Sequence, residues 1–117
     1  GCGGTVRGCR GNRMEQEEKG MIRHVVLYTI KDECKEKIPE LVKAFYGMKD
    51  KIPGLVSLEA GGDELHSERS YDLALITVFE SWDAYKAYLT HPAHLPVKAG
   101  MHAARSGSVS CDYEIKE

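Results

Sequence analysis

A segment near the start of the chain has the hydrophobic pattern of a β-strand. Residues 22–31, IRHVVLYTIK, are rich in β-branched and aromatic side chains. Successive side chains of a strand point to opposite faces, so this segment has two sets of positions. One set is Ile22, His24, Val26, Tyr28 and Ile30. The other includes Val25, Leu27 and Thr29, so we expect both faces of the strand to be at least partly covered.

The following segment has the spacing of an amphipathic helix. We predict a helix that is capped by Asp32 and runs to about Lys51. Its apolar residues recur at i, i+3, i+4 and i+7 and form one buried stripe: Ile38, Leu41, Val42, Phe45, Met48 and Ile52. Pro39 must lie in or near the first turn, because an interior proline would break the helix. Pro53 and Gly54 end it.

Three more segments have strand character. They are residues 55–62, 71–80 and 107–116. The second of them, YDLALITVFE, is the most apolar segment of the chain. In the third, GSVSCDYEIK, apolar and polar positions alternate, with Val109, Cys111, Tyr113 and Ile115 on one side.

A second helical region lies between the last two strands. Ser81 is predicted to cap a short helix that carries four large side chains on one side: Trp82, Tyr85, Tyr88 and Leu89. A further helical stretch is predicted from near Pro92 to about Arg105, with interruptions at Pro96 and Gly100. The complete order of elements is therefore β-α-β-β-α-β.

This order is that of the ferredoxin-like α+β fold, in which two helices cover one face of a four-stranded antiparallel sheet. The other face of the sheet is then bare. It would expose an apolar patch of the kind that soluble monomers avoid: Val25, Leu27, Ala74, Ile76 and Val78. We therefore predict a two-fold dimer in which two sheets close face to face into an α/β barrel.

Composition limits the classes of function. The chain has 117 residues, of which 42% are hydrophobic and 29% charged, as is typical of a single soluble domain. Its net charge of −2, with both signs interspersed, gives no electrostatic footprint for nucleic acid. No apolar run is long enough to span a membrane. We expect a cytoplasmic protein whose partners are a second copy of itself and a small molecule.

Residues 1–20 differ from the rest of the chain. They include five glycines before Asn12 and show neither helical nor strand periodicity, so they are interpreted as a disordered tail or a mis-assigned start. Gln16, Glu17 and Glu18 can be encoded by a sequence that contains a bacterial ribosome-binding site, a short distance before Met21. We therefore expect a bacterial protein with a single domain over residues 21–117.

Four segments carry a resemblance to a known family. They are IRHVVLYTIK, IPGLVSLEAG, SYDLALITVFES and YLTHPAHLPV. Together they resemble the stress-responsive dimeric α/β-barrel (Dabb) family, across residues 21–117. The resemblance implies a homodimeric ferredoxin-like barrel. One plant branch of this family consists of polyketide cyclases, which close poly-β-ketones by intramolecular aldol chemistry without a cofactor. The catalytic tyrosine and histidine of that branch resemble Tyr88 and His94.

The stretch AYLTHPAHLPV, residues 87–97, is the candidate site. Pro92 ends the preceding helix and suits the first position of a new turn, which makes His91 its cap and His94 a first-turn residue. A helix N-terminus favours a neutral imidazole, which can accept a proton. Tyr88 can donate a hydrogen bond to a developing enolate oxygen. This acid–base hypothesis predicts a cavity lined by His24, Tyr88 and His94, and it needs no cofactor.

Two other interpretations stay open. In the first, His91 and Pro92 only form a helix break and Tyr88 is a core aromatic residue, so the protein is a structural or stress-protective dimer. In the second, His91, His94 and His24 hold a metal ion. The second is disfavoured, because the HExxH signature is absent and a helix N-terminus repels cations. We therefore predict no metal and no cofactor. We favour a homodimer that binds an apolar or aromatic small molecule between helices and sheet.

Overall fold

The computed structural model describes residues 20–116. The interpretation of residues 1–20 as a disordered tail or mis-assigned start falls, apart from Gly20, outside the described residues. The elements follow the predicted order, with a 3₁₀ segment η1 and a divided second helical region: β1 (Ile22–Ile30), η1 (Asp32–Lys37), α2 (Ile38–Tyr46), β2 (Leu55–Gly62), β3 (Leu73–Phe79), α3 (Trp82–Leu89), α4 (Leu95–Ala104) and β4 (Arg105–Glu114).

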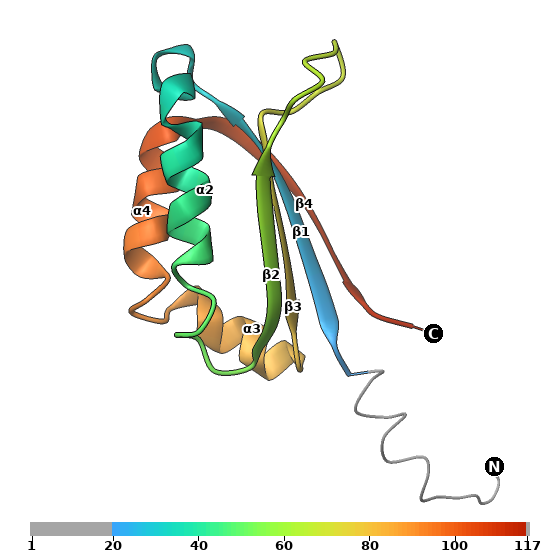
Figure 1. The fold of residues 1–117 in the computed structure, drawn as a ribbon. Helices are drawn as coiled ribbons and strands as arrows, with labels where there is room; N and C mark the ends of the chain where they lie inside the picture. The colour runs from blue at the N-terminus through green and yellow to red at the C-terminus, as the bar shows by residue number, and fades with distance from the viewer. Residues whose placement is uncertain (1–19, 117) are drawn as a thin grey trace, which may run out of the picture.

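The four strands form one antiparallel sheet in the order β2-β3-β1-β4. Figure 1 shows α2, α3 and α4 in one layer against a single face of this sheet, which leaves its other face uncovered. The predicted ferredoxin-like α+β fold is thereby confirmed. None of the helices in the described part of the chain is long and apolar enough to cross a membrane.

The core lies between the helices and the sheet. Of the two faces of β1, the one that carries Ile22, Val26 and Ile30 is covered by the helices, since these three residues are buried. From β3, the same layer receives Leu73, Leu75 and Phe79. The helical side supplies Phe45, Met48, Tyr88 and Met101. Apolar burial of this extent is the main force that holds the helices on the sheet.

The first helix is shorter than predicted. A continuous α-helix from Asp32 would place Pro39 in its interior, where the ring clashes with the preceding turn. The chain instead forms the 3₁₀ segment η1, and α2 begins at Ile38 with Pro39 in its first turn. The helix also ends at Tyr46 rather than near Lys51, because Gly47 follows and the next residues form turns.

The second helical region is capped as predicted but divided differently. The Ser81 hydroxyl accepts a hydrogen bond from the Ala84 backbone N–H at 3.1 Å, so Ser81 is the N-cap of α3. The predicted interruptions at Pro96 and Gly100 are wrong. Helix α4 is continuous through Gly100, and Pro96 lies in its first turn, where a missing N–H costs no helical hydrogen bond.

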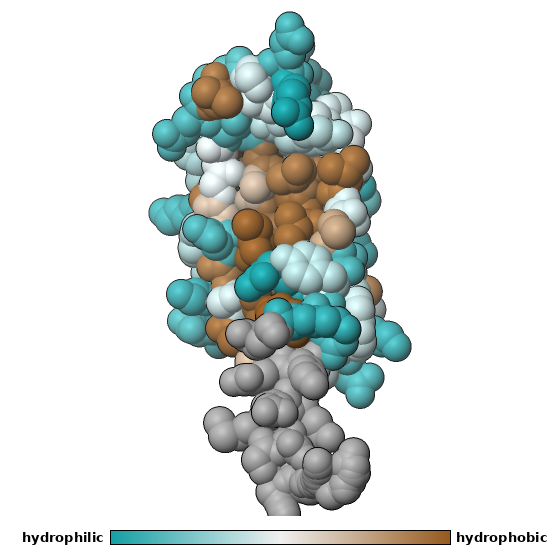
Figure 2. Space-filling model, turned by 90° about the vertical axis from the view of Figure 1, so that its right-hand side faces the viewer, coloured by the Kyte–Doolittle hydropathy of each residue, from teal (hydrophilic) through white to brown (hydrophobic). Residues whose placement is uncertain are grey.

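The uncovered sheet face carries the apolar patch predicted from the sequence. Val25 pairs with Ile76 across the β1–β3 ladder, and Leu27 pairs with Ala74. Figure 2 views this face and shows a hydrophobic band across its middle, with polar side chains around it. On the edge strand β4, Val109 remains 49% exposed.

Candidate functional site

The turn between α3 and α4 is built by His91. Its backbone carbonyl accepts hydrogen bonds from the N–H groups of His94 and Leu95, and its ring Nδ1 accepts one from the Ala93 N–H at 2.9 Å. His91 therefore caps this turn, as predicted. His94 was predicted in the first helical turn and instead occupies the N-cap position of α4.

His94 is buried and held against Tyr88. The two rings are stacked, with centroids 4.0 Å apart and planes inclined by 22°. His94 Nδ1 lies 3.1 Å from the Tyr88 backbone carbonyl oxygen, which can only accept, so Nδ1 donates in the neutral ring and Nε2 keeps its lone pair. Burial lowers the pKa of His94, and backbone hydrogen bonds oppose this only in part. The site thus contains a neutral imidazole with a free acceptor.

Tyr88 brings a buried hydroxyl to the same place. The residue is 2% exposed, and burial is the main cause of the rise in the pKa of its hydroxyl. Tyr88 therefore stays protonated and remains a donor at neutral pH. Within residues 20–116 no side-chain hydrogen bond engages this hydroxyl, since the Tyr88 contact with His94 uses the backbone carbonyl.

His24 approaches from the sheet. It lies on β1 directly opposite Asp112 of β4, and its Nδ1 contacts the Asp112 carboxylate. The Tyr85 ring lies beside it, with centroids 5.1 Å apart. Asp112 was not predicted as a site residue. It lies between the alternating apolar positions Cys111 and Tyr113, so its side chain points to the other face of the strand from theirs. Only the pairing register between the first and last strands shows which histidine it meets.

All three predicted residues line one cavity of about 220 Å³ between the helices and the sheet. His24 lies on the β1 side, whereas Tyr88 and His94 come from the α3–α4 region. Its interior is mainly aromatic and apolar, from Val26, Tyr28, Phe45, Tyr85, Leu89 and Met101. Its remaining lining is more polar and solvent-accessible, from Lys98, His102, Arg105, Ser108 and Ser110. The cavity that the acid–base hypothesis requires is present.

A metal centre finds no support in the same geometry. In the part of the chain that the structure describes, no group of three or more His, Cys, Asp or Glu side chains is arranged to hold a metal ion. His91 already uses its Nδ1 as a cap, and His24 is engaged by Asp112. Cys34 and Cys111 form no disulfide within residues 20–116.

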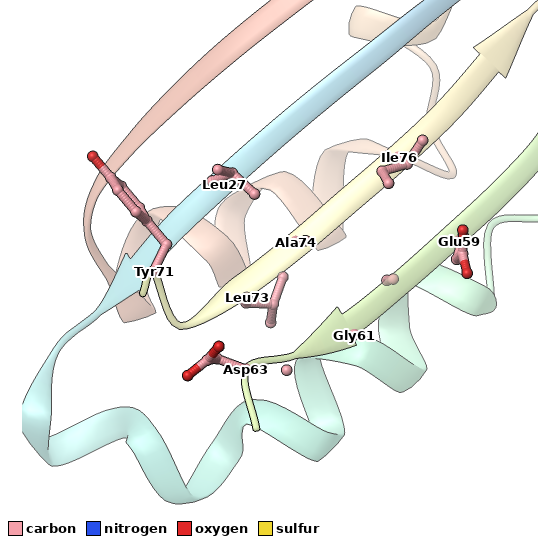
Figure 3. A pocket seen from close by; sticks show the side chains of 10 residues that line it. Leu27, Glu59, Gly61, Asp63, Tyr71, Leu73, Ala74 and Ile76 are labelled. Carbon is pink, nitrogen blue, oxygen red and sulfur yellow. The ribbon is translucent and has the colours of Figure 1, made fainter. Parts of the chain in front are cut away.

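A larger hollow, of about 360 Å³, lies on the uncovered sheet face and contains none of the predicted site residues. Figure 3 shows it between Leu27, Ala74 and Ile76 of the central strands and Glu59 of β2, with Tyr71 and Asp63 at one end. It exists because Gly61 and Ala74 project little or nothing from the sheet at this point. The hollow therefore belongs to the apolar face of Figure 2.

Comparison with known proteins agrees with this fold. The Stress Responsive A/B Barrel Domain family, Dabb, matches residues 22–115. The chain belongs to this family. The stress-response A/B barrel domain-containing protein HS1 of Arabidopsis thaliana is 34% identical over 85 residues, which are 68% of this chain and 76% of that protein. An uncharacterised protein of Streptomyces coelicolor is 33% identical over 100 residues, 81% of this chain and all of that protein.

Among solved structures, a dimeric protein of unknown function with a ferredoxin-like fold from Bacteroides fragilis superposes with a TM-score of 0.74. It is 27% identical in sequence, and the match covers 82% of this chain and 97% of that one. The Dabb assignment rests on the family match and the relatives, and the solved structure agrees with the ferredoxin-like fold.

Proposed function

We propose that this Dabb protein is a homodimer that binds an apolar or aromatic small molecule with a carbonyl or enol oxygen, in the cavity between helices and sheet. The observation that carries the proposal is the Tyr88 hydroxyl, which is buried at the cavity and has no side-chain hydrogen bond within residues 20–116. A buried donor without a partner costs free energy, so a ligand oxygen that accepts its hydrogen bond is favoured.

The homodimer is supported by the apolar sheet face of Figure 2. An apolar band on the central strands is stabilised when a second copy covers it, because burial removes it from water. The dimeric Bacteroides fragilis protein with the same fold supports this assembly. The hollow of Figure 3 would then lie at the subunit contact, away from His24, Tyr88 and His94.

The binding proposal is tested with benzoylacetone, an aromatic β-diketone, by isothermal titration calorimetry. Tyr88→Phe is expected to weaken binding about threefold to tenfold, the value of one neutral hydrogen bond. The matched control is Tyr46→Phe, since the Tyr46 hydroxyl bonds to the Ala60 backbone of β2 and Tyr46 does not line the cavity. If benzoylacetone does not bind, or binds Tyr88→Phe as tightly as wild type, the proposal is wrong.

A second candidate function is acid–base catalysis on the bound molecule, with His94 as the base, Tyr88 as the hydrogen-bond donor and His24 as a third polar group. The free Nε2 of a neutral His94 favours it, because such a nitrogen can take a proton from a carbon between two carbonyls. The proton would pass from carbon to Nε2 while negative charge develops on the carbonyl oxygen near Tyr88. Cyclase-type aldol chemistry begins with this step.

The catalytic candidate is tested by following exchange of the central C–H of benzoylacetone for deuterium by NMR. Wild-type protein is expected to accelerate the exchange. His94→Asn should remove the acceleration, because the asparagine amide can still donate to the Tyr88 carbonyl but offers no basic nitrogen. A fully retained rate in His94→Asn, with benzoylacetone still bound, would exclude His94 as the base.

A further inference from the structure

Basic side chains form part of the lining of the helix–sheet cavity. Lys98 and His102 are four residues apart on α4 and therefore lie on the same side of that helix. Arg105 follows as the first residue of β4, where Figure 1 shows α4 passing directly into the last strand. All three residues line the cavity, and its lining contains neither Asp nor Glu. The lining residues thus carry net positive charge, although the chain as a whole is negative, and the Asp112 carboxylate lies nearby in contact with His24.

Arg105 is held in place without a carboxylate. Its Nη1 donates to the Ser108 hydroxyl at 3.1 Å, and its Nη2 donates to His102 Nδ1 at 3.3 Å. A guanidinium has five N–H donors in a planar fork, so several remain after these two bonds. None of the salt bridges found between residues 20 and 116 involves Arg105 or Lys98. Within these residues, neither charge is therefore paired directly with a carboxylate.

The same cavity also has an aromatic and apolar lining beside these basic residues. Tyr28 and Phe45 stack with ring centroids 6.0 Å apart, and Leu89 and Met101 also line this part. The positive charge of Arg105 reaches this region, since it opposes the rise in the pKa of Tyr28 that burial causes. A molecule that satisfies both kinds of lining must have an apolar body and an anionic head.

We propose that the ligand of this cavity is an aromatic or aliphatic carboxylate, whose carboxylate group is bound by Arg105 and Lys98 while its apolar body contacts Tyr28, Phe45 and Met101. The proposal rests on the proposed function, because it places an acid in the same cavity. A carboxylate suits the planar fork of Arg105, to which it can bind through two parallel hydrogen bonds. Lys98 adds a second charge from the exposed side of α4.

The test compares 2-naphthoate with neutral 2-naphthamide, which has the same ring system without the charge. Wild-type protein is expected to bind naphthoate about tenfold more tightly than the amide, and added salt should reduce this preference. Arg105→Gln and Lys98→Gln should each weaken naphthoate binding about threefold to tenfold and leave amide binding unchanged. Lys86→Gln is the matched control, since Lys86 is exposed on α3 and does not line the cavity.

The outcomes separate this inference from the proposed function. If benzoylacetone binds but naphthoate has no advantage over the amide, the carboxylate proposal is wrong and the binding cavity stands. Tighter binding of 2-naphthyl phosphate than of naphthoate would also overturn it, because the head group would then be a phosphate. If Arg105→Gln fails to fold, binding of naphthoate and of the amide to Lys98→Gln, a substitution at an exposed residue, is sufficient to test the carboxylate proposal. Failure of all these molecules to bind would remove both proposals.

Discussion

At the scale of single residues, the site is built from polar groups whose hydrogen bonds are only partly used. His94 gives its Nδ1 hydrogen to the Tyr88 carbonyl and keeps a free Nε2. Among the described residues, none forms a side-chain hydrogen bond to the Tyr88 hydroxyl, whereas His24 is already engaged by Asp112. Buried polar groups without a hydrogen-bond partner destabilise the folded protein, and they are typical of sites where a ligand supplies the missing partner.

The lowered pKa of His94 predicts a specific dependence of stability on pH. The folded protein binds the His94 proton less readily than the unfolded chain, whose histidines have a pKa of roughly 6.5. This contribution to stability is therefore present in full above that value. It is lost progressively as the pH falls from there toward the lower pKa of the folded state.

The measurement is urea unfolding of wild type and His94→Asn at about pH 7.5 and about pH 5.5, on either side of the ordinary histidine pKa. Wild type is expected to lose more of its free energy of unfolding between the two conditions than the variant does. An equal loss in both proteins would mean that His94 titrates as it does in the unfolded chain.

At the scale of elements, the chain connections position the site. The turn after α2 brings Gly54 against the start of α3, and the Glu80 backbone N–H bonds to the Gly54 carbonyl at 2.9 Å. The Ser81 cap then begins α3, which carries Tyr85 and Tyr88 toward the cavity. The orientation of α3 thus depends on a tight contact between its first turn and this glycine.

Substitutions at two glycines should have opposite effects on stability. Gly54 has φ = 84°, and an added Cβ would lie 2.5 Å from the Ala84 Cβ. Gly54→Ala is therefore expected to destabilise the protein by about 2 kcal/mol. Gly100 lies inside α4 with no atom within 4 Å of an added Cβ. Gly100→Ala should stabilise the protein by about 0.5–1 kcal/mol, because alanine favours the helix.

Thermal and urea unfolding of the two alanine variants measure these changes against wild type. If Gly54→Ala were as stable as wild type, the positive φ of residue 54 and its close contact with Ala84 would not cause strain, and the expectation would be wrong. A destabilised Gly100→Ala would mean that this side of α4 is covered by something other than solvent.

At the scale of the whole molecule, the two faces of the sheet carry different kinds of residue. The helix-covered face holds the core and the cavity with His24, Tyr88 and His94. The uncovered face has the apolar band of Figure 2 and none of these residues. The proposed dimer contact and the proposed ligand cavity therefore lie on opposite sides of one four-stranded sheet.

Replacement of Ile76 by glutamate is expected to break the proposed dimer. Ile76 lies on the central strand β3 opposite Val25, within the apolar band, so the substitution would bury a carboxylate without a partner. Light scattering coupled to size exclusion should give about twice the chain mass for wild type and a monomer or aggregate for Ile76→Glu. The control is Lys86→Glu on the helical layer, which should stay dimeric. A wild-type monomer at all concentrations would rule the dimer out.

Local features of the sequence were sufficient for the fold class and for part of the site. The two faces of β1, the strand at Leu55–Gly62 and the Ser81 cap follow from periodicity and capping preferences over a few residues. Tyr88 and His94 were found because they lie within one short stretch with a defining proline. The boundaries of α2 and α4 were less well predicted. The 3₁₀ segment before Pro39 was predicted as part of α2, and Pro96 was predicted as an interruption although it lies in a first turn.

Tertiary structure alone decided which distant residues meet. Asp112 faces His24 because β4 pairs with β1 in one register, and a shift by one residue would turn that carboxylate to the other face. Arg105 and Lys98 line the same cavity only because α4 and the start of β4 lie beside the helix–sheet gap. Such contacts join segments far apart in the chain, and they are set by the packing of the whole core, which no local pattern encodes.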